Sequence, residues 1–300
     1  MIFRRWRPRQ ELRPSARSAS GAALDIAWLG TAGHIVRTAG TTILIDPFLT
    51  RPGFARLLFG RLSTDAGALA RLPEKVDAVL CGHSHFDHLL DAPEIARRTG
   101  ALLVGSGSTC AFGRAAGLPE TQLCEVPPEG RTLAVGDCEV RFVPSLHGRI
   151  FLGRVPFPGT VSAPRLPARM WHYRMGGAFG VLVRAPGATV YHNGSADLID
   201  AELAGVRADV LLVGLAGRKA TRDYLGRLVT ALEPGLIVPT HHDAFFAPLT
   251  RGVHLLPGID LDGFVSEVRR VAPRATLVTP DYFEPLAVPA GDARGAALVA

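Results

Sequence analysis

The sequence lacks long apolar runs, and no stretch approaches the ~20 consecutive apolar residues of a transmembrane helix. The first residues also lack the apolar segment of a secretory signal, which favours a cytoplasmic protein. Cysteine is scarce, with four in 300 residues, and no two form a C-x-x-C pair. This spacing excludes a zinc knuckle and a thioredoxin-like motif, and we expect the thiols to be reduced and buried.

Charge is sparse outside one short segment. Charged residues make up 20% of the chain, and the net charge is +6. Residues 1 to 20 hold six arginines and one glutamate, so the rest of the chain is close to neutral. A nucleic-acid partner is therefore not expected. We interpret residues 1–22 as a basic, disordered tail; the alternative is a weak contact with an anionic membrane, with Phe3 and Trp6 inserted.

Two catalytic signatures are also missing. No G-x-S-x-G sequence occurs, so nothing supports a serine hydrolase. The GSGS stretch at 105–108 lacks the lysine and the hydroxyl residue of a phosphate-binding Walker motif.

Apolar residues make up 47% of the chain, which is typical of a soluble globular enzyme.

Strand-like and helix-like segments alternate in two successive rounds, each beginning with β-hairpins and continuing with β–α units. In the first round we expect a strand at 24–30, a hairpin at 34–46, strands at 76–81 and 101–105, and helices at 91–100 and 108–117. In the second we expect strands at 131–135 and 138–145, a hairpin at 178–193, strands at 209–214, 236–240 and 275–279, and helices at 219–232 and 259–271. The doubling predicts an α/β (α+β) fold in which residues 23–300 form one domain of two similar halves.

One segment concentrates the histidines of the chain. His83-Ser84-His85-Phe86-Asp87-His88 directly follows the predicted strand 76–81, at the end where α/β folds place their sites. Two imidazoles two residues apart on an extended segment point the same way and can hold one metal ion. If the chain then turns, Asp87 and His88 face the other side of that ion, where a second could bind. Nitrogen and oxygen ligands without a thiolate suit Zn²⁺, Fe²⁺ or Mn²⁺.

The segment HSHFDH resembles the H-x-H-x-D-H signature of the metallo-β-lactamase superfamily. WLGTAGHIV followed by ILIDPFL resembles the opening hairpins of the branch that includes ascorbate-phosphate lactonases and N-acyl-phosphatidylethanolamine phospholipases D. VPSLHG and LIVPTHHDAF resemble the later steps that supply further ligands. The resemblance covers about residues 24–250 and implies an αββα sandwich with hydrolase activity.

The resemblance also implies two sets of metal ligands: His83, His85 and His147 for one ion, and Asp87, His88 and His241 for the second. In that family a late strand ends in Gly-Asp, and the aspartate bridges the two metals. Here Gly194 is followed by Ser195, with Asp197 two residues further on. We expect Asp197 to bridge, because a carboxylate balances dication charge and a hydroxyl does not. The alternative is that Ser195 takes the bridging position and weakens the second site.

This ligand set predicts a metal-dependent hydrolase, with two zinc ions expected. Two adjacent dications lower the pKa of a shared water and make a metal-bound hydroxide available at neutral pH. Asp87 is expected to orient that hydroxide. His242 could be a general acid, a substrate contact or a satisfied surface residue.

Segment 148–177 is the expected substrate wall, because it follows His147 and is rich in prolines, aromatic residues and arginines. We expect substrate contacts from its aromatic residues and arginines, which include Phe157, Trp171, Arg149 and Arg174, joined by Arg218 and Lys219. The alternative is a surface loop with solvated arginines. The predicted substrate is an anionic amphipathic ester, such as a phosphodiester or a phospholipid-like molecule. Two alternatives stay open: a lactonase of the ascorbate-phosphate type, and a non-catalytic or mononuclear metal-binding protein.

Overall fold

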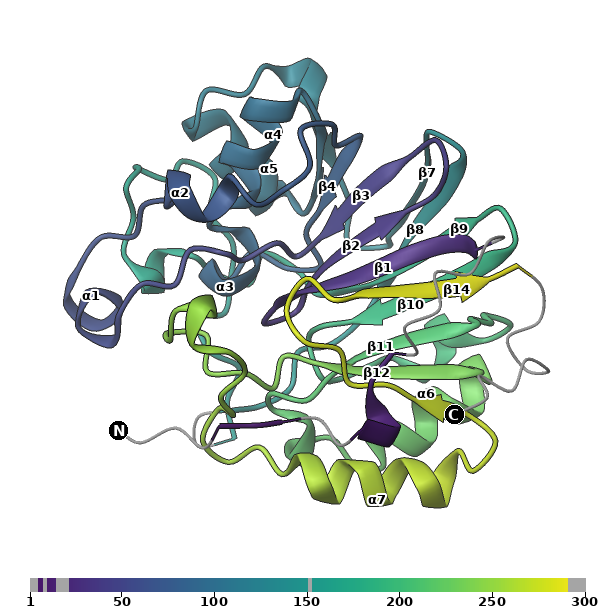
Figure 1. Ribbon diagram of the computed structural model, residues 1–300. Helices are drawn as coiled ribbons and strands as arrows, with labels where there is room; N and C mark the ends of the chain where they lie inside the picture. The colour runs from purple at the N-terminus through teal and green to yellow at the C-terminus, as the bar shows by residue number, and fades with distance from the viewer. Residues whose placement is uncertain (1–4, 8–9, 15–21, 151–152, 291–300) are drawn as a thin grey trace.

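The computed structural model describes residues 5–7, 10–14, 22–150 and 153–290. Its strands form two seven-stranded sheets that pack face to face between two layers of helices (Figure 1). The predicted αββα sandwich of two similar halves is confirmed. None of the helices in the described ranges is long and apolar enough to cross a membrane.

The first sheet holds the early part of the chain and one late edge strand. Its order is β14 (Pro285–Pro289), β1 (Ala22–Gly30), β2 (Gly33–Arg37), β3 (Thr42–Ile45), β4 (Ala78–Leu80), β5 (Leu102–Gly105) and β6 (Leu123–Glu125). The β2 strand pairs with β1 and with β3 in antiparallel orientation. From β3 to β6, each strand is parallel to the next. Its helical segments are α1 (Phe54–Phe59), α2 (Ala66–Leu69), α3 (Phe86–Leu89), α4 (Ala92–Thr99) and α5 (Gly107–Ala115).

The second sheet repeats this plan. Its order is β13 (Thr276–Leu277), β12 (Leu236–Thr240), β11 (Val210–Gly214), β10 (Ala188–Asn193), β9 (Phe179–Ala185), β8 (Cys138–Pro144) and β7 (Arg131–Val135). Strands β7 to β10 are antiparallel and β10 to β13 are parallel. The α6 helix (Tyr224–Leu232) and the α7 helix (Leu261–Val271) lie on its outer side, opposite α4 and α5 (Figure 1).

The core lies in three layers that follow from this arrangement. Alternating inward side chains of both sheets, such as Ile26 and Val36 facing Val140 and Val183, form the central layer. One outer layer lies under α6 and α7, and the other under α4 and α5. The central parallel strands β4, β11 and β12 are buried along their whole length, as expected for strands covered on both faces.

Part of the N-terminal segment packs against the folded body. Trp6 is 7% exposed and joins the core under α6 and α7, and its backbone N–H donates to the Val253 carbonyl at 2.9 Å. Leu12 is also buried, and its carbonyl accepts from the Thr279 N–H at 2.7 Å. For these residues the prediction of a disordered tail is wrong, because they bury apolar side chains and complete backbone hydrogen bonds. Phe3 lies outside the described residues.

Candidate metal centre

The candidate ligands gather where both sheets present the carboxyl ends of their strands. The segment that begins at His83 follows β4, and His241 directly follows β12. His147 follows β8 and pairs with Ala196, just after β10, in an isolated β-bridge. The fold therefore brings together side chains that are far apart in the sequence, at the edge that parallel strands share.

The first ligand group consists of His83, His85 and His147, whose ligand atoms all lie within 4.8 Å of one another. His85 Nε2 lies 2.9 Å from the Pro156 carbonyl oxygen, and His147 Nδ1 lies 2.7 Å from that of Gly148. Because a carbonyl oxygen only accepts, each of these nitrogens donates, and the other ring nitrogen keeps a lone pair for a metal ion. The backbone thus sets which ring nitrogen of His85 and His147 faces the centre.

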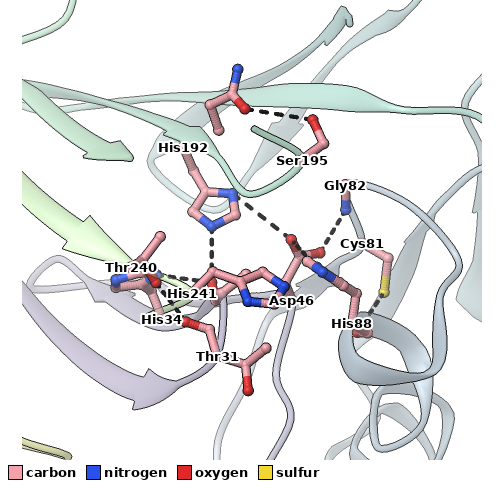
Figure 2. Close-up of polar contacts among 12 residues, drawn as sticks. Thr31, His34, Asp46, Cys81, Gly82, His88, His192, Ser195, Thr240 and His241 are labelled. Carbon is pink, nitrogen blue, oxygen red and sulfur yellow. Dashed lines mark hydrogen bonds and ion pairs between the residues drawn. The ribbon is translucent and has the colours of Figure 1, made fainter. Parts of the chain in front are cut away.

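The second group consists of Asp87, His88 and His241, with ligand atoms again within 4.8 Å of one another. His241 Nε2 lies 3.3 Å from Asp87 Oδ2. Asp46 lies behind His88, with its Oδ2 2.8 Å from His88 Nδ1, and its Oδ1 accepts the Gly82 N–H at 2.7 Å (Figure 2). The Asp46 carboxylate therefore holds a proton on His88 Nδ1 and leaves Nε2 for a metal ion.

The two groups adjoin each other, since the ring centroids of His83 and His88 are 3.8 Å apart. His83 is buried, and neither of its ring nitrogens has a hydrogen-bond partner within the part of the chain that the structure describes. A buried polar group without a partner is costly, and a metal ion would satisfy it. The residues present therefore fit a pair of metal ions.

Burial keeps the first group neutral. It lowers the pKa of His85 to about 4 and that of His147 to about 3, and it lowers the pKa of His83 well below the ordinary value. In each case removal of the imidazolium from water is the largest cause, and the neighbouring histidines add to it. Neutral imidazoles are the form that binds metal.

The second group carries the negative charge. Burial alone would raise the pKa of Asp87, but His88 and His241 outweigh it and hold that pKa below its usual range. Burial opposes the charging of His88, yet Asp46 and Asp87 together raise its pKa. Asp87 is therefore ionised at neutral pH and available as a ligand.

A buried ion pair holds the loop that carries His241. His241 has a left-handed backbone with φ 53°, which is uncommon for a residue other than glycine. Its N–H donates to the Thr31 carbonyl at 2.7 Å, and the Thr31 N–H donates to Asp243 Oδ1 at 2.8 Å. Asp243 Oδ2 accepts from the Tyr282 hydroxyl at 2.8 Å and lies 3.0 Å from Arg51 Nη1. These contacts fix the loop in the conformation that turns His241 towards Asp87.

A cavity of about 820 Å³ opens beside both ligand groups. Five aromatic rings line it: Phe54, Phe86, Phe157, Phe245 and Phe246. Three cationic residues line it as well: Arg149, Arg218 and Lys219. The guanidinium of Arg218 is 2.6 Å from Glu267 Oε2, so its charge is already balanced, whereas Arg149 and Lys219 are exposed. The site therefore combines metal ligands, an apolar wall and positive charge.

Some predicted substrate residues do not reach this cavity. The Arg169 guanidinium lies over the Trp171 ring, with its carbon 5.2 Å from the ring centroid. Arg174 donates to the Pro158 carbonyl at 2.9 Å. Neither Trp171 nor Arg174 lines the cavity, whereas Arg218 and Lys219 do. Segment 148–177 nonetheless contributes Arg149 and Phe157 to the wall, and both are among the residues of this segment expected to contact the substrate.

His242 is placed in the core. It is 1% exposed and stacks on Trp28 with ring centroids 4.5 Å apart, and it does not line the cavity. Burial lowers its pKa to about 4. The interpretation of His242 as a surface residue is therefore wrong. Its buried position outside the cavity supports neither a role in substrate contact nor one as a general acid.

The expected bridging carboxylate is not brought to the centre. Asp197 Oδ1 accepts the N–H of Leu198 at 2.9 Å, and the Ser195 hydroxyl donates to the Leu146 carbonyl at 2.9 Å. Neither side chain belongs to a ligand group among the described residues. The prediction that one of them bridges two metals therefore has no support from the geometry.

The sequence did not lead to a prediction for Asp46, which lies behind His88. Its carboxylate directly follows a buried strand in ILIDPFL, and that position could have indicated it.

An αββα sandwich with two adjacent three-residue ligand groups at its shared strand edge defines a metal-dependent hydrolase of the metallo-β-lactamase type. A family profile described as the beta-lactamase superfamily domain matches residues 25–241. The chain belongs to this superfamily.

Named relatives agree with this assignment. A "UPF0173 metal-dependent hydrolase" of Pyrobaculum arsenaticum is 31% identical over 234 residues, which cover 76% of this chain and 87% of the relative. A protein of the same name from Anaeromyxobacter dehalogenans is 30% identical over 239 residues, which cover 76% of this chain and 77% of the relative. The solved structure of Igni18, a metallo hydrolase from Ignicoccus hospitalis, matches the fold with a TM-score of 0.56 at 21% identity, over 87% of this chain and 95% of that one.

Proposed function

We propose that this protein is a dinuclear zinc hydrolase that cleaves an anionic amphipathic ester, such as a phosphodiester or a phospholipid-like molecule. The observation that carries the proposal is the cavity, in which both ligand groups open onto aromatic walls and exposed cations. The rings would bury the apolar part of such a substrate, while Arg149 and Lys219 would bind its anionic group. Four cysteines without a disulfide are consistent with a cytoplasmic location.

The chemistry follows from what each group can hold. Two bound divalent ions would supply an activated water and polarise the oxygen of the scissile group. Asp87 stays ionised at neutral pH, so its carboxylate can accept a hydrogen bond from that water and orient it. The aromatic walls would exclude bulk water, which strengthens the electrostatic interactions inside the cavity. The nitrogen-rich donor set favours Zn²⁺ over Fe²⁺ and Mn²⁺.

A substrate panel on metal-defined protein tests this proposal. We would compare phosphodiesters, neutral carboxylic esters and lactones, each with and without an acyl chain, on zinc-loaded, chelator-treated and zinc-restored protein. We expect the anionic acyl-chain substrates to be hydrolysed best, with activity lost on chelation and regained with zinc. Arg149→Met and Lys219→Met should each raise KM for these substrates by about tenfold, because one charge-assisted hydrogen bond is lost. Neutral substrates should be unaffected.

Arg174→Met is the matched control, because Arg174 lies in the same segment as Arg149 but outside the cavity. An equal rise in KM for Arg174→Met and Arg149→Met would contradict the assigned contact. Preference for lactones without an acyl chain would favour the lactonase alternative. No metal-dependent hydrolysis of any substrate would favour the non-catalytic protein.

A further inference from the structure

The exposed large apolar side chains of the described residues gather near the mouth of the cavity. They are Phe54, Phe59, Leu146, Ile150 and Leu166, and we call these five side chains the apolar rim. Phe59 is 76% exposed and Phe54 53%, although phenylalanine is among the residue types most often buried. An exposed cluster of this kind marks a surface that another body covers.

The segments that carry the apolar rim lie beside one another. Phe54, at the start of α1, and Ile150 both line the cavity. Leu166 belongs to a segment that is held against the end of α1, because the Leu62 N–H donates to the Ala168 carbonyl at 2.7 Å. The α1 helix projects beyond both sheets on this side of the molecule (Figure 1). The rim is therefore one surface assembled from separate parts of the chain.

The segments around the rim carry positive charge only. Residues 54–62, 146–150 and 153–169 contain no aspartate or glutamate. Their exposed arginines are Arg56, Arg61, Arg149, Arg154 and Arg165. This surface therefore attracts an anionic body, and it would repel the same surface of a second copy of the chain.

We propose that the apolar rim docks this protein onto a membrane surface that contains anionic lipid. The rim side chains enter the boundary between headgroups and acyl chains, and the arginines contact lipid phosphates. Phe54 and Ile150 extend this apolar surface into the cavity, so a lipid passes from one to the other, whereas a folded acidic partner would cover the mouth. Trp6 takes no part, because it is buried in the core under α6 and α7. Docking goes beyond the proposed function, since it needs neither metal ions nor hydrolysis.

Vesicle binding by the chelator-treated full-length chain tests the proposal. Sedimentation with vesicles of phosphatidylcholine, with and without phosphatidylglycerol, measures the partition coefficient. We expect binding to the anionic vesicles to be on the order of tenfold tighter than to the neutral ones. Added salt should weaken it, because the charges of the rim segments are exposed.

Two apolar residues outside the cavity separate docking from the site. Phe59→Ser together with Leu166→Ser should lower the affinity for anionic vesicles on the order of tenfold, because two insertable side chains are lost. Phe59→Trp should keep the wild-type affinity, since tryptophan is favoured at membrane interfaces. Both side chains are exposed and neither lines the cavity, so urea unfolding midpoints should stay at the wild-type value.

A pair of arginine variants tests the contribution of charge. Arg56→Ala together with Arg165→Ala should weaken binding to anionic vesicles on the order of tenfold. Arg270→Ala together with Arg274→Ala is the matched control, because these exposed arginines lie on and just after α7, away from the rim. The control pair should keep the wild-type affinity.

Three results would overturn the proposal: equal affinities for wild type and the serine pair, equal losses from the two arginine pairs, or binding of poly-glutamate without binding of vesicles. The last would assign the surface to an acidic protein. A chain that docks but cleaves no ester would refute the proposed function and leave the docking surface standing. A chain that cleaves soluble esters but does not dock would do the reverse.

Discussion

At the scale of single residues, local spacing accounts for four ligands and distant contacts account for the rest. His83, His85, Asp87 and His88 lie within six positions, so their convergence follows from the turn that α3 makes after β4. The placement of the later ligands followed only from the family resemblance, since sequence spacing does not report the approach of two sheets. The orientation of Asp197 depends on hydrogen bonds of its own loop, and no sequence pattern reports these.

The Arg51–Asp243 pair gives a prediction at this scale. Both side chains are almost fully buried, so Arg51→Met should leave the Asp243 charge uncompensated and lower the free energy of unfolding by about 3–5 kcal/mol. Asp243→Asn should do the same to Arg51, and the double variant should recover part of the loss. Urea denaturation measures all three.

The exposed pair of Arg184 and Glu139 provides the matched control, and Arg184→Met should change stability little. If the two single losses at Arg51 and Asp243 simply add in the double variant, the ion pair is not the source of the stability.

At the scale of elements, hydrophobic periodicity and the glycine, proline and capping residues at element ends located most strands and helices. Gly100 ends α4 in a left-handed conformation, as its glycine stop predicts. The α6 helix begins at Tyr224 rather than 219, because residues 218–220 form a separate 3₁₀ turn. Two strands were missed: β6 has three residues, and β14 has proline at both ends, which an edge strand tolerates.

The packed N-terminal segment gives a prediction at the scale of elements. Trp6→Ala should remove a large buried ring from the core under α6 and α7 and lower the free energy of unfolding by about 3 kcal/mol. Arg7→Ala, at the exposed neighbouring position, should have little effect. Urea unfolding followed by circular dichroism measures both. Equal unfolding midpoints for Trp6→Ala and wild type would show that the segment contributes nothing to stability.

At the scale of the whole molecule, the doubled order of strands and helices predicted two packed halves, because each sheet must bury both faces. The cavity could not be predicted in the same way. Its wall combines α1, the segment after His147, the loop at 215–220 and the loop after His241, which are separate in sequence and meet only when the sheets pack. Composition could indicate aromatic and cationic residues in these loops, but it could not indicate which of them face one another.

The buried histidines predict how the stability of the metal-free protein depends on pH. The pKa is about 4 for His85 and about 3 for His147 in the folded chain, against roughly 6.5 for histidine in the unfolded chain. Between these values the unfolded state binds more protons, so the free energy of unfolding must fall as pH falls. His88 does not mask this trend. Its raised pKa contributes stability that is fully present below the pKa of the unfolded chain and is lost only as pH rises above that value.

We therefore expect full stability of the metal-free protein at about pH 7 and a progressive loss from about pH 6.5 towards pH 4. Urea unfolding of chelator-treated protein across this range measures the slope. His85→Asn and His147→Asn should each make the slope shallower, because they remove a group that is protonated only after unfolding. A metal-free wild type whose stability stays constant from about pH 7 to about pH 5 would show that these imidazoles already reach water in the folded state.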